Sequence, residues 1–448
     1  MKCLLVSFLS LVMLASSAQF SVSNNKRYLL KDGKAFFWLG DTAWELFHRL
    51  DKAESEKYLK RRSEQGFTVI QAVALAEMDG LHTPNANGDL PLTNDDPTTP
   101  NEKYFSFMDT VIDMAANYNI NIALLPTWGD KVFKDSWGTG PEIFNEQNAV
   151  VYAQWLAHRY KDKKNIIWVL GGDRNPRNDA DKNIWRAMGN AIKKETGNKA
   201  IISFHPQPNQ FGSAEYFPND AWIDFHLFQT GHCKDAAVYD KIQSVYNMQP
   251  TKPVMDAEPI YEDHPVCFNA KELGTSNSLD VRRSAYLDLF AGAFGHTYGC
   301  HDIWQMYSAK AVPVNGPHIY WQEAMELPGA NQMKYVRNLL EAFPFLERIP
   351  DQSIIKEKNT TAAERVQATR GHDYLMVYST AGKAFTVNMG KIKGATVKGF
   401  WYNPRNGEKK IIDAVANSHS KKYTPPTSGY GQDWVLVLFD ANKNYEVK

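Results

Sequence analysis

The feature that most constrains this chain is a regular alternation of short apolar segments with longer amphipathic ones. Eight short segments, bounded by turn residues, have the apolar character of buried strands. They are 36–40, 68–75, 120–126, 165–171, 200–204, 222–228, 253–257 and 292–298. Between them apolar residues recur at helical spacing, as at Tyr104, Met108 and Val111. Because such repeats build parallel sheets, the sequence predicts an α/β fold, a (β/α)8 TIM barrel.

The pattern changes after residue 345. From there to residue 448, short alternating strands are separated by turns rich in Gly, Asn and Pro. The clearest strands are predicted at 374–378, 396–402 and 434–439. The sequence therefore predicts a catalytic barrel over 19–345 and a small all-β sandwich over 346–448.

The composition narrows the partners that this chain could have. Of its 448 residues, 50 are Lys or Arg and 50 are Asp or Glu, so no basic excess favours a nucleic-acid partner. The chain is rich in aromatic side chains, with 12 Trp, 21 Tyr and 23 Phe. Flat rings with polar edges suit the apolar faces of sugars, so the aromatic content is consistent with an oligo- or polysaccharide substrate. The oligomeric state stays open.

The first residues have the pattern of a secretory signal peptide. Lys2 precedes an apolar run over 3–15, and the small residues Ser16, Ser17 and Ala18 follow it. We expect cleavage after residue 18, export to the periplasm or the medium, and no membrane insertion of the mature chain.

Cleavage would leave three cysteines, Cys233, Cys267 and Cys300. Three cysteines allow at most one internal disulfide, and the sequence leaves open whether one forms. A large apolar core must therefore hold the fold.

Two carboxyl groups follow predicted strands at the end of the barrel where active sites lie. Asp173 follows strand 165–171 through a pair of glycines, and Glu258 follows strand 253–257. About three βα units separate them, which places them across the barrel mouth from one another. Glycoside cleavage requires such a pair, with one carboxyl protonated and the other ionised. The alternative for each is an ion pair with a rim arginine such as Arg174.

Four segments carry a resemblance to a known family. The resemblance is to sequence motifs of the apiosidase-like glycoside hydrolases, family 140 and its relatives. It is carried by residues 38–44 (WLGDTAW), 125–131 (LPTWGDK), 170–175 (LGGDRN) and 255–259 (MDAEP). The C-terminal part resembles the collagen-binding-type β-sandwich that is appended to these barrels.

The resemblance implies a retaining hydrolase without a cofactor, in which Asp173 is the general acid/base and Glu258 the nucleophile. It implies plant cell-wall pectin as substrate, specifically apiose in side chains of rhamnogalacturonan II. The wider clan usually has Asn-Glu at the end of the fourth strand, where this sequence has Gly172-Asp173, as in the apiosidase-like branch.

Other polar and aromatic residues near strand ends are candidates for substrate contacts. They are Asp41, Trp44, Gln71, Trp128, Lys131, Asn175, His205, Gln229, Tyr261, His296, Tyr298 and Trp304. A carboxylate there could bind sugar hydroxyls, and a tryptophan could stack on a ring face. The alternative for each is a paired polar group of the barrel or an aromatic of its wall.

Two other functions fit parts of the sequence. Five histidines, at 205, 226, 232, 296 and 301, suggest a metal-dependent barrel hydrolase. The first strand, however, carries Gly40-Asp41-Thr42 in place of His-x-His, and the chain has no His-Glu-x-x-His, so no metal is expected. The third reading is a non-catalytic glycan-binding or adhesion protein, in which two opposed acids would have no use. Turnover that survives a chelator would distinguish the enzyme from both.

Overall fold

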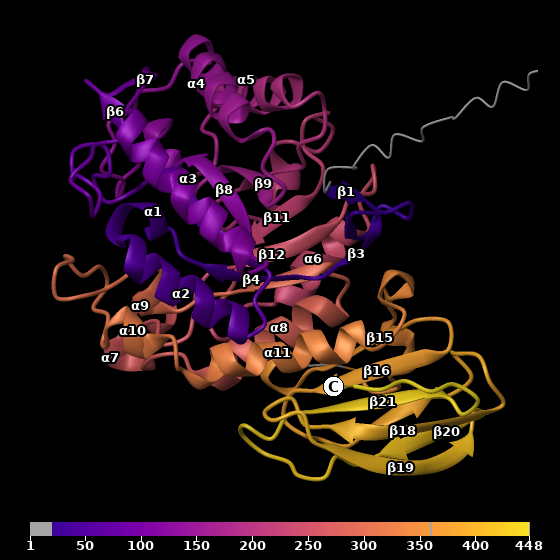
Figure 1. The fold of residues 1–448 in the computed structure, drawn as a ribbon. Helices are drawn as coiled ribbons and strands as arrows, with labels where there is room; N and C mark the ends of the chain where they lie inside the picture. The colour runs from indigo at the N-terminus through magenta and orange to yellow at the C-terminus, as the bar shows by residue number, and fades with distance from the viewer. Residues whose placement is uncertain (1–19, 359–360, 448) are drawn as a thin grey trace, which may run out of the picture.

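The computed structural model describes residues 20–358 and 361–447, so the predicted signal peptide lies outside the described residues. An α/β barrel forms the larger part, and antiparallel β-sheets form a second part packed against it (Figure 1). Within the described ranges, no helix is both long and apolar enough to cross a bilayer.

Eight parallel strands form the barrel, and they confirm the predicted fold. They are β4 (Trp38–Thr42), β5 (Val69–Leu75), β8 (Asn121–Thr127), β9 (Ile166–Gly171), β10 (Ile202–His205), β11 (His226–Gln229), β12 (Val254–Glu258) and β13 (Gly295–Tyr298). Six pair in the order β10-β9-β8-β5-β4-β13, and β11 pairs with β12. Two backbone hydrogen bonds close the ring, from the N–H of Asp224 to Ile202 O and from the N–H of Phe294 to Val254 O.

The first barrel strand lies two residues later than its prediction over 36–40. The beginning of the predicted segment belongs instead to a small antiparallel sheet of β1 (Phe20–Val22), β2 (Leu29–Lys31) and β3 (Lys34–Phe36). The barrel strand begins only at Trp38, so Asp41 lies within β4 and not after it.

Helices alternate with the strands and surround them (Figure 1). The longer ones are α2 (Lys52–Glu64), α3 (Glu102–Asn117), α4 (Glu146–Tyr160), α5 (Asp179–Glu195), α6 (Val238–Tyr246), α8 (Ser278–Phe290) and α11 (Pro328–Glu341). The apolar stripe of α3 is buried as its spacing predicts, and α2 begins at a capping box formed by Asp51 and Glu54. Between β10 and β11 the helical segment is only the short turn η2 (Gly212–Glu215).

Short elements and long loops gather at the carboxyl ends of the strands. They are α1 (Leu46–Arg49), the hairpin β6 (Leu92–Thr93) and β7 (Asp96–Pro100), η1 (Gly129–Lys131), η3 (Val266–Phe268), α7 (Ala270–Leu273), α9 (His301–Trp304) and α10 (Trp321–Ala324). The two connections over 78–102 and 129–146 are long, which is usual for loops that shape a substrate site.

The second part is a sandwich. Its main sheet is antiparallel in the order β14 (Ile349–Pro350), β15 (Val366–Arg370), β16 (Tyr374–Ser379), β21 (Trp434–Asp440), β18 (Thr396–Tyr402) and β19 (Lys409–Ala416). An antiparallel pair of strands, β17 (Phe385–Asn388) and β20 (Ser420–Tyr423), covers one face. Trp401 and Trp434 are both buried in the core between the two layers.

The other face of the main sheet packs on the barrel. Along β16, Leu375 and Val377 belong to the core of the sandwich, whereas Tyr374, Met376 and Tyr378 belong to the core shared with the barrel. Because side chains alternate along a strand, this one strand serves both cores.

Candidate active site

A cleft of about 1100 Å³ opens at the carboxyl ends of the barrel strands. Residues predicted to be functional form part of its lining: Trp44, Trp128, Asp173, Gln229, Glu258, Tyr261 and Trp304. The loop over 77–86, the loop around Trp137 and the segment 308–315 complete its walls. The structure therefore brings the two predicted carboxyl groups into one cavity.

Asp173 reaches this cleft through a turn that requires glycine. Gly171 and Gly172 have φ values of +88° and +112°, in the left-handed region that favours glycine. A Cβ atom at Gly171 would lie 2.4 Å from the carbonyl oxygen of His205, and one at Gly172 would lie 2.8 Å from the indole of Trp128. The glycine pair thus lets β9 end in a tight turn with the Asp173 side chain partly exposed to the cleft.

The environment of Asp173 favours its protonated form. Burial, followed by the nearby charge of Glu258, raises the pKa of the Asp173 carboxyl to about 7, although His205 and Arg174 act in the opposite direction. The Nη1 atom of Arg174 lies 3.7 Å from Oδ2 of Asp173, which is too far for a close ion pair. Arg174 instead donates hydrogen bonds to backbone carbonyls, among them that of Phe133 at 2.9 Å.

Glu258 is the last residue of β12, and its environment favours the ionised form. Its Oε2 lies 3.2 Å from Nε2 of His205, and its Oε1 lies 3.4 Å from Nε2 of His232. Burial works to raise the pKa of Glu258, but the two histidines together hold it well below its usual range. The backbone is fixed as well, because its carbonyl oxygen accepts the N–H groups of Thr230 and Gly231.

Several buried polar atoms of the cleft have no hydrogen-bond partner among the described residues. They are the indole Nε1 of Trp128, Oε1 of Gln229 and the hydroxyl of Tyr261. Buried polar atoms in folded proteins are nearly always paired, so exceptions that share one cavity indicate groups reserved for a ligand. Beside them the rings of Trp44 and Trp128 lie 5.2 Å apart, as a wall on which a sugar could pack.

Other predicted contact residues do not line the cleft. Asp41 faces away from the barrel interior, and its Oδ2 accepts hydrogen bonds from Arg62 at 2.6 Å and from Tyr58 at 2.5 Å, both on α2. Lys131 is buried, and its Nζ donates to the carbonyl oxygen of Ala76 at 2.7 Å. Both charged side chains are therefore paired with groups of the protein and do not face the cleft.

The same correction applies to the last strand. His296 is buried, with its Nδ1 2.9 Å from Oδ2 of Asp288 on α8, and Tyr298 donates to Glu262 at 2.7 Å. Since side chains alternate along a barrel strand, a polar residue near its end can point outward to the helices instead of inward to the mouth.

Three further predicted residues lie near the cleft without forming its wall. His205 is buried behind Glu258, and Gln71 donates to the carbonyl oxygen of Ala257 at 2.9 Å. Asn175 lies beyond Asp173, where its backbone N–H donates to the side chain of Gln207 at 3.1 Å. They support the site from behind or beside it.

The cleft contains residues that the sequence did not single out. Glu77 follows β5 by two residues, and the pKa of its carboxyl is raised well above the usual value by burial and by the charges of Glu45 and Asp173. The strand-end rule, applied to β5, would have found it. Trp137 is 56% exposed in a long loop, with the guanidinium of Arg174 4.7 Å from its ring centre.

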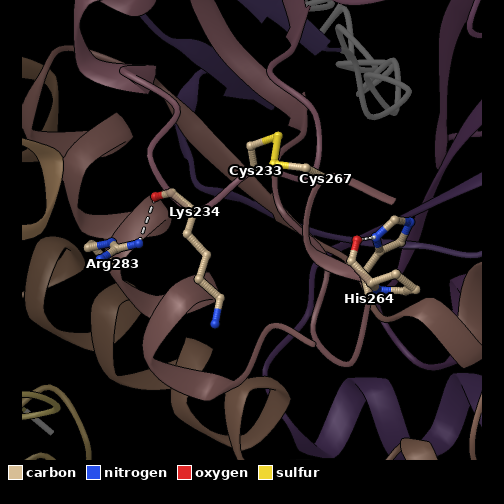
Figure 2. The surroundings of a disulfide bond; sticks show 6 residues. Cys233, Lys234, His264, Cys267 and Arg283 are labelled. Carbon is tan, nitrogen blue, oxygen red and sulfur yellow. Dashed lines mark hydrogen bonds between the residues drawn. A yellow bond between two sulfur atoms is a disulfide. The ribbon is translucent and has the colours of Figure 1, made fainter. Parts of the chain in front are cut away.

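His232 was named from the sequence only as one of five histidines of a metal-dependent alternative, and its place beside Glu258 was not predicted, because it lies in an irregular loop after β11. The next residue, Cys233, forms a disulfide with Cys267 in η3 (Figure 2). Cys300 is buried and forms no disulfide. The disulfide therefore joins the loops that follow β11 and β12, the strand that carries Glu258.

The histidines near the mouth have partners of several kinds. His205 and His232 face Glu258, and Nδ1 of His226 lies 3.0 Å from the Ser213 hydroxyl. Over residues 20–358 and 361–447, no group of three or more His, Cys, Asp or Glu side chains could hold a metal ion.

Comparison with known proteins agrees with this geometry. Residues 23–347 match the model of the apiosidase-like catalytic domain. The chain belongs to the apiosidase-like family. Residues 349–439 of this apiosidase-like protein match a second model, described as "Putative collagen-binding domain of a collagenase".

Solved structures resemble this apiosidase-like protein over nearly its whole length. A glycoside hydrolase family 5 protein from Bacteroides vulgatus is 34% identical with a TM-score of 0.88, and the match covers 96% of this chain and 94% of that one. A structure named glycoside hydrolase is also 34% identical with a TM-score of 0.88, covering 96% and 99%. No curated protein matches the chain. The fold is that of a glycoside hydrolase.

Proposed function

We propose that this protein is a retaining glycoside hydrolase in which Asp173 is the general acid/base and Glu258 the nucleophile. The observation that carries the proposal is the contrast between two carboxyl groups of one cleft: the pKa of Asp173 is raised to about 7, whereas that of Glu258 is held below its usual range. Environments that separate the pKa values of two acids are how glycosidases assign the two roles.

The two residues would act in two displacements. In the first, the ionised Glu258 attacks the anomeric carbon while Asp173 gives its proton to the departing glycosidic oxygen, leaving a glycosyl ester on Glu258. In the second, Asp173 takes a proton from a water molecule, which attacks the same carbon and releases Glu258. The unpaired Gln229, Tyr261 and Trp128 groups are placed to bind sugar hydroxyls.

The proposed substrate is a plant cell-wall polysaccharide, with apiose in side chains of rhamnogalacturonan II as the first sugar to test. Membership of the apiosidase-like family supports this choice, and the cleft volume and its tryptophans suit an oligosaccharide.

Export is the remaining part of the proposal. Two independent features support it, namely the signal-peptide pattern over residues 1–18 and the Cys233–Cys267 disulfide, since disulfides persist mainly outside the cytosol.

The test is incubation with apiose-containing and apiose-free pectic oligosaccharides, with and without a chelator, followed by proton NMR of the released sugar. We expect release of apiose that survives the chelator and retains the anomeric configuration in the first product. Inversion would exclude the nucleophile role of Glu258. If neither wild type nor Glu258→Gln releases any sugar from the panel, the protein is not a hydrolase of these substrates, and the alternative of a glycan-binding protein is favoured.

A further inference from the structure

The loops that follow β11 and β12 are fastened to each other beside Glu258. The disulfide joins Cys233 to Cys267, and the backbone N–H of Cys267 donates a hydrogen bond to the carbonyl oxygen of His232 at 2.9 Å. Figure 2 shows the disulfide, with Lys234 and Arg283 to one side and His264 to the other. The covalent link and the hydrogen bond attach to the adjacent residues 233 and 232, so together they fix the backbone of His232.

The ring of His232 is fixed by packing as well. It stacks on His264 with 3.9 Å between ring centres and lies 4.5 Å from the ring of Tyr261. Only 7% of His232 is exposed, and its Nε2 faces Oε1 of Glu258. A small shift of the loop would therefore separate the imidazole from the carboxylate.

The segment on the other side of the disulfide has a costly backbone. Cys267 and Phe268 have φ values of +50° and +60°, in the left-handed region that residues other than glycine rarely adopt. Such conformations persist only where surrounding contacts hold them. The disulfide and the hydrogen bond to His232 are two of these contacts, so we expect the loop to relax when the disulfide is lost.

We propose that the Cys233–Cys267 disulfide is a positioning element of the active site that holds His232 against the nucleophile Glu258. The inference rests on the proposed function, because it gives His232 its purpose beside that nucleophile. Neither cysteine touches the reacting atoms; both act through His232. Loss of the disulfide frees the loop, Glu258 loses one of its two imidazole partners while remaining buried, and its pKa rises.

Other titratable groups face Glu258 and limit the size of this rise. They are His205 on β10, Asp173 after β9, Glu77 after β5, Tyr261 after β12 and, through the backbone N–H of Glu258, Asp256 on β12 itself. Tyr261 and His264, whose pKa values also respond to Glu258, lie on the loop that carries Cys267, whereas His205 lies on β10 and still favours ionisation after the disulfide is lost. We expect a rise of about one pH unit, the effect of losing one close partner.

The experiment compares the acid limb of the kcat/KM profile, which reports ionisation of the nucleophile in the free enzyme. The variants are Cys233→Ser with Cys267→Ser, His232→Gln, and the three substitutions together. We expect the first two to move the limb to higher pH by about one unit each. The triple variant should show no further shift than His232→Gln alone, because the disulfide acts only through His232. Val312→Ala is the control, since the exposed Val312 lines the cleft on the segment 308–315, outside the two cysteine-bearing loops, and should leave the limb where it is.

An unmoved limb in the double cysteine variant would overturn the proposal, as would a triple variant that shifts beyond His232→Gln. Should the double variant fail to fold, wild type treated with a dithiol, which reduces the disulfide to two thiols and becomes a cyclic disulfide itself, replaces it. A wild type that hydrolyses no glycoside refutes the proposed function only. Carbon-13 NMR of the Glu258 carboxyl, assigned with Glu258→Gln, then tests the disulfide alone by its titration midpoint.

Discussion

The molecule buries charged groups in two places, and it treats them differently. At the contact between barrel and sandwich, Asp433 is fully enclosed and accepts hydrogen bonds from Arg282 at 2.7 and 2.8 Å and from the hydroxyl of Tyr378 at 2.9 Å. In the cleft, Glu258 is almost as deeply buried, yet its carboxylate oxygens have looser partners, the Nε2 atoms of His205 at 3.2 Å and of His232 at 3.4 Å.

The difference separates a structural use of buried charge from a chemical one. A buried carboxylate that is saturated with donors contributes to a unique packing of the two domains and has nothing left to offer a ligand. A buried carboxylate with looser partners can still bind or react with a ligand, and proteins keep such groups where they take part in chemistry. The following predictions test whether the two places differ in this way.

The largest expected effect comes from replacing the nucleophile. Glu258→Gln keeps the size of the side chain and removes its charge, so we expect turnover to fall by about 10⁴-fold or more. The thermal unfolding midpoint should fall modestly, because the environment that holds the pKa of Glu258 low stabilises the folded chain through the ionised carboxylate, and Gln does not replace that charge. Steady-state kinetics and calorimetry measure the two quantities. A variant that loses stability but keeps turnover would place Glu258 with the structural charges.

The second effect depends on the leaving group. Asp173→Ala should reduce turnover of natural glycosides by about 10² to 10⁴-fold, the usual contribution of a general acid. Aryl glycosides with acidic leaving groups need no proton, so their first displacement should be spared. Comparison of the two substrate classes in wild type and variant measures this. Equal losses on both classes would contradict the assignment of Asp173.

The third effect belongs to the structural charge. Asp433→Ala leaves Arg282 buried without its partner, and we expect the free energy of unfolding to fall by about 3–5 kcal/mol. At temperatures where the variant is folded, kcat/KM should match wild type, since the interface lies away from the cleft. The matched control is Asp113→Ala at an exposed ion pair with Lys163, for which denaturant unfolding should show about 1 kcal/mol or less. If both variants lose a similar free energy of unfolding, the buried ion pair of Asp433 contributes no more than an exposed one.

The barrel could be predicted from sequence because its strands are buried on both faces. Residues such as those of β9 form an uninterrupted apolar run, which is recognisable without knowing what covers each face. The same reason explains β16, whose alternate side chains enter two different cores. The strand order of the sandwich and the contact through Asp433 depend on long-range packing, which no local pattern records.

The site was predictable only in part. The sequence Gly171-Gly172-Asp173 predicts a tight turn at a strand end, and the structure places the Asp173 carboxyl in the cleft. Asp41 and His296 carry the same signal but face the outer helices, because a shift of one residue in a strand exchanges its two faces. His232 and the pairing of Cys233 with Cys267 lie in irregular loops, where spacing along the chain says little about position in space.

The smallest effect is a pH dependence that belongs to Asp173 alone. Its pKa of about 7 means that the proton required for the leaving group is lost as the pH rises through neutrality. We therefore expect kcat/KM on natural glycosides to fall about tenfold per unit above pH 7, while the ionised Glu258 remains unchanged there. In Asp173→Asn this alkaline limb should vanish from the residual activity, measured between about pH 5 and pH 9. If the alkaline limb persists in Asp173→Asn, it belongs to another group of the cleft. Asp173 would then not be the proton donor, and the proposed division of roles between Asp173 and Glu258 would be wrong.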